Sequence, residues 1–144
     1  AMTYVDLNPM RAGIADTPET SDFTSIQARL KALSKQQETA PFLFPFVGNP
    51  TNQIIQGIPF RLMDYIELVD WTGRVQTRKS QYKASLDNST PAILQRLSVS
   101  QTTWLKACTR LERSRATAVG CYCHAKITKQ HLQKSRINLF RLDT

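Results

Sequence analysis

The stretch Tyr4-Val5-Asp6-Leu7-Asn8-Pro9-Met10-Arg11-Ala12-Gly13 decides how the fold begins, because it combines a helix end, a helix start and a stop signal. Asn8 can cap a following helix through its side-chain oxygen, and Pro9 at the first helical position lacks only an N–H that the helix does not need. Gly13 can adopt the left-handed conformation that ends a short helix. We therefore predict a helix end over residues 2–8 and a short helical turn over residues 9–14. Since the first helix has almost no room before it, we expect the chain to be the back part of a larger protein.

Apolar residues at helical spacing predict further helices along the chain. The predicted ranges are 22–37, 60–74, 91–97, 101–118 and 123–134. We expect Ser21 or Asp22 to cap the first of these helices and Gly73 to end or loosen the second. Residues 137–142 fit either a packed tail or a short strand. The sequence thus predicts an all-α fold of five or six short helices with an extended Pro/Phe-rich connection.

That connection covers residues 40–59, where four prolines and two glycines exclude a long regular element. Its run Phe42-Leu43-Phe44-Pro45-Phe46 is too apolar for a disordered linker. We expect the segment to lie extended against the helices and to bury its phenylalanines. The alternative is an exposed strip that docks a partner.

The net charge of +8 is concentrated near the C-terminus. Residues 105–144 contain nine Lys/Arg against two Asp/Glu, which gives +7, whereas residues 1–40 carry −1 and residues 41–104 carry +2. A basic region of this kind suits contact with the phosphate backbone of DNA, and the alternative is a solvated helix surface. The candidate nucleic-acid-binding residues are Arg11, Arg74, Arg78, Lys79, Lys106, Arg110, Arg113, Arg115, Lys126 and Lys129.

The turn Leu97-Ser98-Val99-Ser100 joins two predicted helices and is a candidate helix-turn-helix connection. On this hypothesis Gln101, Thr102 and Thr103 would lie near base edges at the start of the second helix. Short turns also join helices in any α-helical domain, so ordinary packing is the alternative.

The three cysteines, Cys108, Cys121 and Cys123, favour a reducing, cytoplasmic setting because their number is odd. The cluster Cys121-Tyr122-Cys123-His124 invites a zinc hypothesis, but its spacing fits none of the usual ligand patterns. We expect buried or incidental cysteines, no metal and no cofactor in this chain. No apolar run approaches the roughly 18 residues that a membrane span needs, so we expect no membrane partner.

Three stretches of the sequence resemble one family. A tyrosine, three residues, then Asn-Pro and Arg-Ala-Gly is similar to the tyrosine-helix motif of REP-associated tyrosine transposases, which belong to the HUH single-strand DNA transposases. Asp22–Arg29 resembles the segment that follows this motif, and Asp64–Arg74 resembles a block in longer members with a helical C-terminal extension. The resemblance covers Tyr4 to about Arg74, is loose to about Leu111 and is absent beyond.

The resemblance implies cleavage and rejoining of single-stranded DNA by a tyrosine hydroxyl, with a divalent metal such as Mg²⁺ held by a His-hydrophobe-His pair. Tyr4 matches the catalytic nucleophile by position. The His pair is missing, because the chain has only His124 and His131, both far downstream of Tyr4. A phenol with an ordinary pKa of about 10 needs a metal or a base to attack phosphate. We therefore predict that Tyr4 is inert here and that the chain binds single-stranded or hairpin DNA without catalytic competence of its own.

Two alternatives belong to other classes: a degenerate mobile-element remnant that acts only in self-association, and a tyrosine-donating half that is complemented in trans. We expect residues 1–15 to be the remnant of the tyrosine-bearing helix of a missing catalytic domain, and residues 16–144 to be a helical C-terminal domain. Loss of the catalytic half would uncover apolar surface on the Tyr4 helix and the Phe42–Phe46 strip. Such surface tends to be covered by self-association, so we predict a homo-oligomer.

Overall fold

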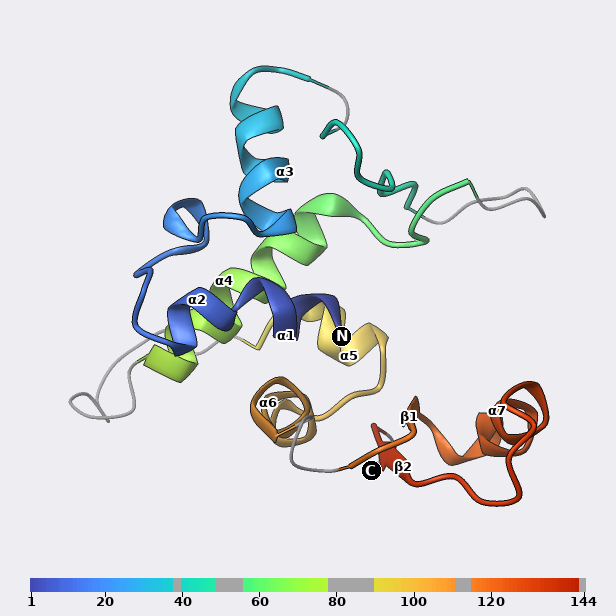
Figure 1. Cartoon of the computed structure of the whole chain (residues 1–144). Helices are drawn as coiled ribbons and strands as arrows, with labels where there is room; N and C mark the ends of the chain where they lie inside the picture. Colours follow the sequence, from blue (N-terminus) through green and yellow to red (C-terminus); the bar gives the residue numbers. More distant parts are fainter. Residues whose placement is uncertain (38–39, 49–55, 78–89, 111–114, 143–144) are drawn as a thin grey trace. The chain divides into compact units, whose positions relative to one another are not determined.

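The computed structural model describes residues 1–37, 40–48, 56–77, 90–110 and 115–142. Within them lie seven α-helices and one two-stranded parallel sheet (Figure 1). The chain is therefore mostly helical, and the small sheet corrects the all-α prediction. It divides into two compact units, Met2–Pro91 and Ala92–Thr144, of which the second also takes Ala1. None of the helices in the described residues has the length and apolar character for crossing a membrane.

The first unit begins with α1 (Met2–Asp6) and α2 (Asn8–Arg11), as the opening stretch predicts. Pro9 lies in the first turn of α2, and Gly13 after it has a φ of +68°. The predicted Asn8 cap is wrong, because Asn8 is already the first residue of α2 and its side-chain oxygen accepts a hydrogen bond from Arg11 instead. A short 3-10 turn, η1 (Pro18–Thr20), follows.

Helix α3 (Ser25–Ser34) is capped by Thr24, whose hydroxyl accepts the backbone N–H of Gln27 at 3.3 Å. The prediction of Ser21 or Asp22 as the cap is therefore wrong by two or three residues. Both side chains have other partners, since the Ser21 hydroxyl donates to the backbone of the preceding turn and the Asp22 carboxylate accepts the side-chain amide of Gln27. The helix consequently begins at Ser25, three residues later than the predicted start.

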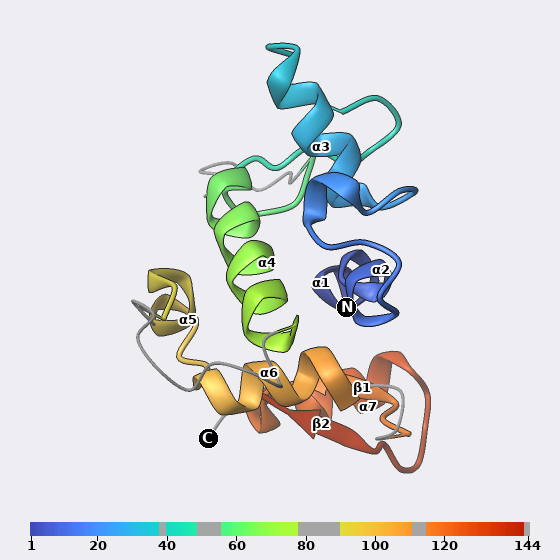
Figure 2. The ribbon, with the colours of Figure 1, turned by 90° about the vertical axis from the view of Figure 1, so that its left-hand side faces the viewer.

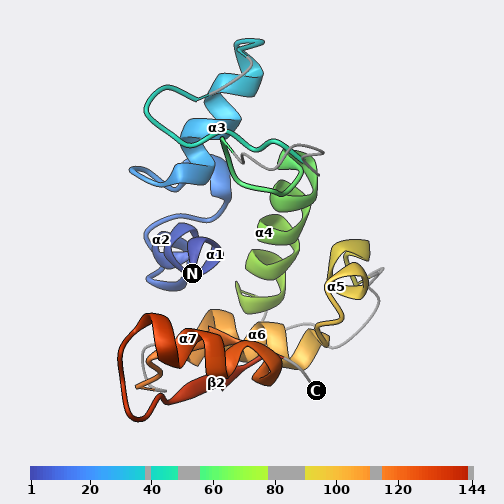
Figure 3. The ribbon, with the colours of Figure 1, turned by 90° about the vertical axis from the view of Figure 1, so that its right-hand side faces the viewer.

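Helix α4 (Leu62–Thr77) continues through Gly73, where the sequence predicts that the helix ends or loosens. A Cβ at Gly73 would lie 2.8 Å from Cε of Met10 and 3.3 Å from Cδ2 of Leu7. The missing side chain therefore allows close approach of α4 to the α1–α2 segment, and Figures 2 and 3 show these elements side by side. Gly73 is a packing residue and not a helix stop.

The core of the first unit forms where these helices meet. Tyr65 and Val69 are buried, as the apolar stripe of α4 predicts, and Trp71 is buried near the end of that helix. The buried cluster consists of Leu7, Met10, Ala15, Ile26, Tyr65 and Val69. Burial of these side chains supplies the hydrophobic stabilisation of the unit.

The Pro/Phe-rich connection partly buries only Phe46 among its three phenylalanines. Phe46 and Ile58 form a parallel bridge, and the Phe46 ring stacks on the Tyr65 ring with 5.1 Å between centroids. Phe42 is fully exposed and Phe44 is 68% exposed, so the prediction of buried phenylalanines is wrong for these two. Phe42 lies in a turn with a φ of +63°, before the paired segment that brings Phe46 to α4.

The second unit contains α5 (Ala92–Arg96), α6 (Gln101–Arg110) and α7 (Ala125–His131), with the 3-10 turn η3 (Tyr122–His124) before α7. Strands β1 (Ala118–Gly120) and β2 (Leu139–Arg141) pair in parallel, with Val119 opposite Phe140. The helix predicted over residues 101–118 extends from Gln101 to Arg110 in the structure, and Ala118 itself begins β1. The helix predicted over residues 123–134 is shorter at both ends. Residues 139–141 form a strand, which is one of the two structures predicted for residues 137–142.

Candidate nucleic-acid interface

Tyr4, Asn8 and Arg11 of the opening motif lie together on α1 and α2. Tyr4 is half-buried, and the guanidinium carbon of Arg11 lies 3.8 Å from the centroid of its ring. Arg11 also donates a hydrogen bond from Nη2 to the side-chain oxygen of Asn8. A cation over an aromatic face is attracted by the ring quadrupole, so this contact fixes the orientation of both side chains. The structure thus places one of the predicted nucleic-acid-binding residues directly against the tyrosine.

Asp6, in the same motif, is a buried carboxylate that is not among the predicted site residues. It is 2% exposed, and its oxygens accept the backbone N–H of Ser25 at 2.9 Å and the Ser25 hydroxyl at 2.8 Å. The hydroxyl of Tyr65 donates to the same carboxylate at 2.5 Å, and the N–H of Ile26 donates at 3.3 Å. Since Ser25 and Ile26 open α3, the carboxylate neutralises the positive end of that helix and satisfies its unpaired N–H groups.

This network joins the three stretches that carry the family resemblance. Asp6 comes from the first stretch, Ser25 from the second and Tyr65 from the third. One carboxylate therefore holds α1 against the starts of α3 and α4, and with α1 it fixes the position of Tyr4. The sequence gives only a weak signal for this role, namely an aspartate among apolar residues of a predicted helix.

Tyr65 differs from Tyr4 in its suitability for chemistry. Burial raises the pKa of the Tyr65 phenol far above its ordinary value of 10, and the hydrogen bond to Asp6 raises it further. The side chain therefore remains a protonated donor, which is the opposite of what a nucleophile requires.

Arg29 is the buried cation of the same region and is 5% exposed. Its Nη2 donates to the carbonyl oxygen of Phe44 at 3.0 Å, and its guanidinium carbon lies 4.5 Å from the centroid of the Phe46 ring. Burial lowers the pKa of Arg29, while the nearby Tyr65 and Asp6 raise it. These contacts tie the Pro/Phe-rich connection to α3 and leave Arg29 unavailable to an external phosphate.

The second unit carries its charge at the surface. Every Lys and Arg in the described part of this unit is exposed. The described part of the unit contains no Asp or Glu. Lys106 and Arg110 are one turn apart on α6, and Lys126 and Lys129 are nearly one turn apart on α7, so each pair shares a helix face. The nine exposed basic residues are Arg96, Lys106, Arg110, Arg115, Lys126, Lys129, Lys134, Arg136 and Arg141. Five of these residues are among the predicted candidates, and Lys134, Arg136 and Arg141 continue the same basic composition.

The predicted basic residues outside the second unit have different surroundings. Arg74 is exposed but forms an ion pair with Asp70 of the same helix at 2.7 Å. Arg78 and Lys79 lie outside the described residues, and so does Arg113 of the second unit. Apart from Arg74, the exposed and structurally described candidates therefore belong to Ala92–Thr144.

The candidate helix-turn-helix connection lies between α5 and α6. Ser98 has a φ of +53°, and the Ser100 hydroxyl accepts the N–H of Thr103 at 3.2 Å, which caps α6. Thr102 is exposed, whereas Gln101 is half-buried at the start of the helix. The turn lies where it is predicted, and base contact by these side chains stays a prediction.

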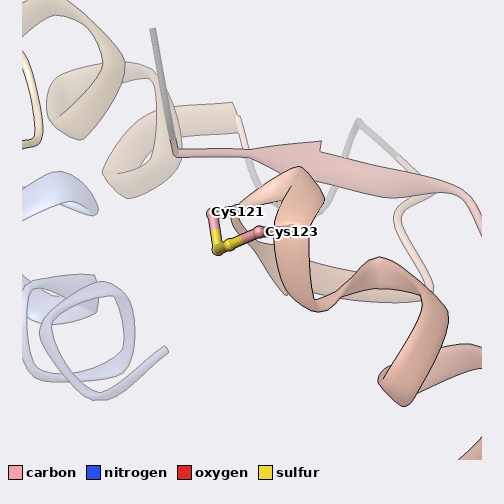
Figure 4. The surroundings of a disulfide bond; sticks show 2 residues. All are labelled: Cys121 and Cys123. Carbon is pink, nitrogen blue, oxygen red and sulfur yellow. A yellow bond between two sulfur atoms is a disulfide. The ribbon is translucent and has the colours of Figure 1, made fainter.

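The cysteines behave in two ways. Cys108 is 3% exposed, in line with the expectation of buried cysteines. Cys121 and Cys123 are joined by a disulfide, which corrects that expectation for the pair (Figure 4). Their Cα atoms lie 5.5 Å apart, within the range that a disulfide can bridge.

The residues present do not fit the divalent metal that the resemblance implies. The sequence lacks a His-hydrophobe-His pair, and in the part of the chain that the structure describes no three His, Cys, Asp or Glu side chains converge. Nδ1 of His131 lies 2.9 Å from the carbonyl oxygen of Ile127 on its own helix.

Comparison with known proteins adds no further assignment. Neither the protein-family models, nor the curated proteins, nor the solved structures contain a match to this chain.

Proposed function

We propose that this chain is the DNA-binding helical portion of a transposase-like protein that acts on single-stranded or hairpin DNA, without catalytic competence of its own. The observation that supports this proposal is the surface of Ala92–Thr144, whose described residues include nine exposed basic side chains and no acidic one. Phosphate contacts by Lys and Arg release condensed counterions and supply most of the affinity of sequence-independent binding. The resemblance of the opening motif to a DNA-processing family agrees with the same partner.

The binding mode predicts a steep dependence on salt. If about five of these side chains contact phosphates, the logarithm of the association constant falls with a slope of about −3.5 against the logarithm of salt concentration on single strands. Fluorescence anisotropy with a labelled single strand and a labelled hairpin, titrated at increasing salt, measures this slope. Absence of binding at low salt would contradict the proposal and favour the alternative of a remnant that acts only in self-association.

A matched pair of charge reversals locates the interface. Lys126→Glu with Lys129→Glu changes two exposed cations of α7, and Lys31→Glu with Lys35→Glu changes two exposed cations at and just after the end of α3 in the other unit. Both double variants alter the net charge equally. We expect the α7 variant to weaken binding roughly 10- to 100-fold and to reduce the salt slope, and the other variant to have a much smaller effect. Equal losses would show that only the overall charge matters.

The contact of Arg11 with the Tyr4 ring favours a second candidate, in which Tyr4 supplies the nucleophile to a centre completed by another chain. Incubation of the chain alone with single-stranded DNA and Mg²⁺ or Mn²⁺ tests whether completion is needed. We expect no covalent protein–DNA product on a denaturing gel, with Tyr4→Phe as the control. A product that Tyr4→Phe abolishes would show that the chain is catalytically competent by itself.

A further inference from the structure

The disulfide between Cys121 and Cys123 lies at the end of β1, where the chain enters η3 (Figure 4). Only Tyr122 separates the two cysteines in sequence. Cys121 is half-buried and Cys123 is exposed, so the bond lies at the surface of the unit. The bond therefore differs from the buried disulfides that stabilise small domains.

A disulfide that closes so short a loop contributes little to folding. Its stabilising effect comes largely from restricting the unfolded chain, and this restriction increases with the number of residues in the loop. Residues two apart are already close in the unfolded state. A stabilising role therefore explains this disulfide poorly. Thiol–disulfide exchange, in contrast, requires a bond that is accessible from solvent, as this one is.

The electrostatic surroundings also favour exchange. The guanidinium carbon of Arg141 lies 5.8 Å from the centroid of the Tyr122 ring, between the two cysteines in sequence. Lys126 is exposed on the first turn of α7, and the described residues of this unit contain no Asp or Glu. Nearby cations stabilise a thiolate, which lowers the barrier for one cysteine to leave during attack on the bond.

We propose that Cys121 and Cys123 form a reversible redox site that exchanges with low-molecular-weight thiols of the glutathione class. The thiolate of one glutathione attacks a cysteine sulfur, the S–S bond breaks, and the other cysteine leaves as a thiolate that takes up a proton. A second glutathione thiolate then attacks the glutathione sulfur of the mixed disulfide and releases the remaining cysteine. Two glutathione molecules become oxidised to one glutathione disulfide, and the protein gains two thiols. Oxidised glutathione drives the reverse reaction.

Cys108 provides an internal control for this site. It is buried on α6, so its thiol is shielded from reagents in solution. In the reduced protein under native conditions we expect alkylation of Cys108 to be at least about tenfold slower than alkylation of Cys121 and Cys123. Peptide mass spectrometry after alkylation with N-ethylmaleimide distinguishes the three positions.

The decisive experiment equilibrates the full chain in a series of glutathione buffers, from fully oxidised to fully reduced, followed by acid quenching and alkylation. We expect the 121–123 peptide to change from the disulfide form to the doubly alkylated form within this series. The proposal is overturned if the disulfide persists at the most reducing ratio, or if both thiols stay free in the fully oxidised buffer.

A single-cysteine variant tests the mechanism separately. In Cys121→Ser the partner that would expel glutathione is removed, so we expect a mixed disulfide to accumulate on Cys123 in oxidised glutathione. The wild-type chain should show almost none, because its second thiol is only two residues away. Equal accumulation in the two proteins would contradict exchange between neighbouring cysteines, whatever the outcome of the DNA-binding tests.

Discussion

The two units use charge in opposite ways. In Met2–Pro91 the carboxylate of Asp6 is 2% exposed and bonded to residues 19 and 59 positions away in sequence. In Ala92–Thr144 all nine described basic side chains are exposed, and the only buried residues among those described are Ile93, Leu94 and Cys108. Charge organises the interior of the first unit and the surface of the second.

This difference separates folding from binding. A buried charge is tolerated only where hydrogen bonds and opposite charges offset its loss of hydration, so its removal acts mainly on stability. Exposed charges of one sign create a field that attracts phosphate and change stability little. Substitutions in the first unit should therefore affect unfolding, and charge reversals in the second should affect DNA binding.

The largest expected effect is that of Asp6→Ala. The substitution leaves the N–H groups of Ser25 and Ile26 and the hydroxyl of Tyr65 without their acceptor inside the protein. We expect a loss of roughly 3–5 kcal/mol in the free energy of unfolding, because breaking a buried charged network leaves its other members uncompensated.

The measurement is urea unfolding followed by tryptophan fluorescence in a Trp104→Phe background. The chain has two tryptophans, so Trp71 then reports on the first unit alone. Asp16→Ala is the matched control, since Asp16 is exposed and should change stability by less than about 0.5 kcal/mol. Similar losses of unfolding free energy in the two variants would mean that the hydrogen bonds of Asp6 do not stabilise the first unit.

The next effect concerns two glycines, one from each unit. A Cβ at Gly57 would lie 2.6 Å from the carbonyl oxygen of Pro45 and 2.5 Å from Cγ1 of Val47, whereas a Cβ at Gly120 would meet no atom within 4 Å. We expect Gly57→Ala to lower the free energy of unfolding by about 2–3 kcal/mol, because the backbone oxygen cannot move aside cheaply. Gly120→Ala should be neutral to within about 0.5 kcal/mol. Urea unfolding monitored by Trp71 and by Trp104 in the complementary single-tryptophan backgrounds compares the two, and a neutral Gly57→Ala would contradict the close packing of the bridge at Phe46.

Local signals explain which elements could be predicted from the sequence. Pro9 and Gly13 define the second helix within six residues, and the apolar stripe of α4 identifies Tyr65 and Val69 as buried. The expected helix stop at Gly73 failed because the partner of that glycine, Met10, lies 63 positions earlier. The spacing of residues along one helix does not show where a second helix packs against it.

The same limit applies to the candidate sites. The exposure of the basic residues follows from their charge and could be predicted. The role of Asp6 could not, because its partners come from distant stretches. The pairing of Ala118 with Leu139 and the bond between Cys121 and Cys123 are likewise decided by the fold, although both cysteines are visible in the sequence.

The smallest of the expected effects on unfolding is that of Tyr65→Phe, and it depends on pH. The variant keeps the ring that stacks on Phe46 and removes the hydroxyl that donates to Asp6, so we expect a loss of roughly 1.5–2 kcal/mol at neutral pH. Burial and Asp6 raise the pKa of the folded-state phenol well above its ordinary value of 10. A raised pKa means that the contribution of Tyr65 is complete below pH 10 and declines above it, because the unfolded chain then releases a proton that the folded chain retains.

The difference in unfolding free energy between wild type and Tyr65→Phe should therefore be constant at neutral pH and become smaller as the pH rises above 10. Urea unfolding at a series of pH values in the Trp104→Phe background measures this difference directly. Tyr122→Phe serves as the control, since Tyr122 is 70% exposed and belongs to the other unit. A difference for Tyr65→Phe that stays constant or increases above pH 10 would mean that the phenol ionises at least as readily in the folded protein as in the unfolded chain. The Asp6 network would then be open to solvent, like the basic surface of the second unit.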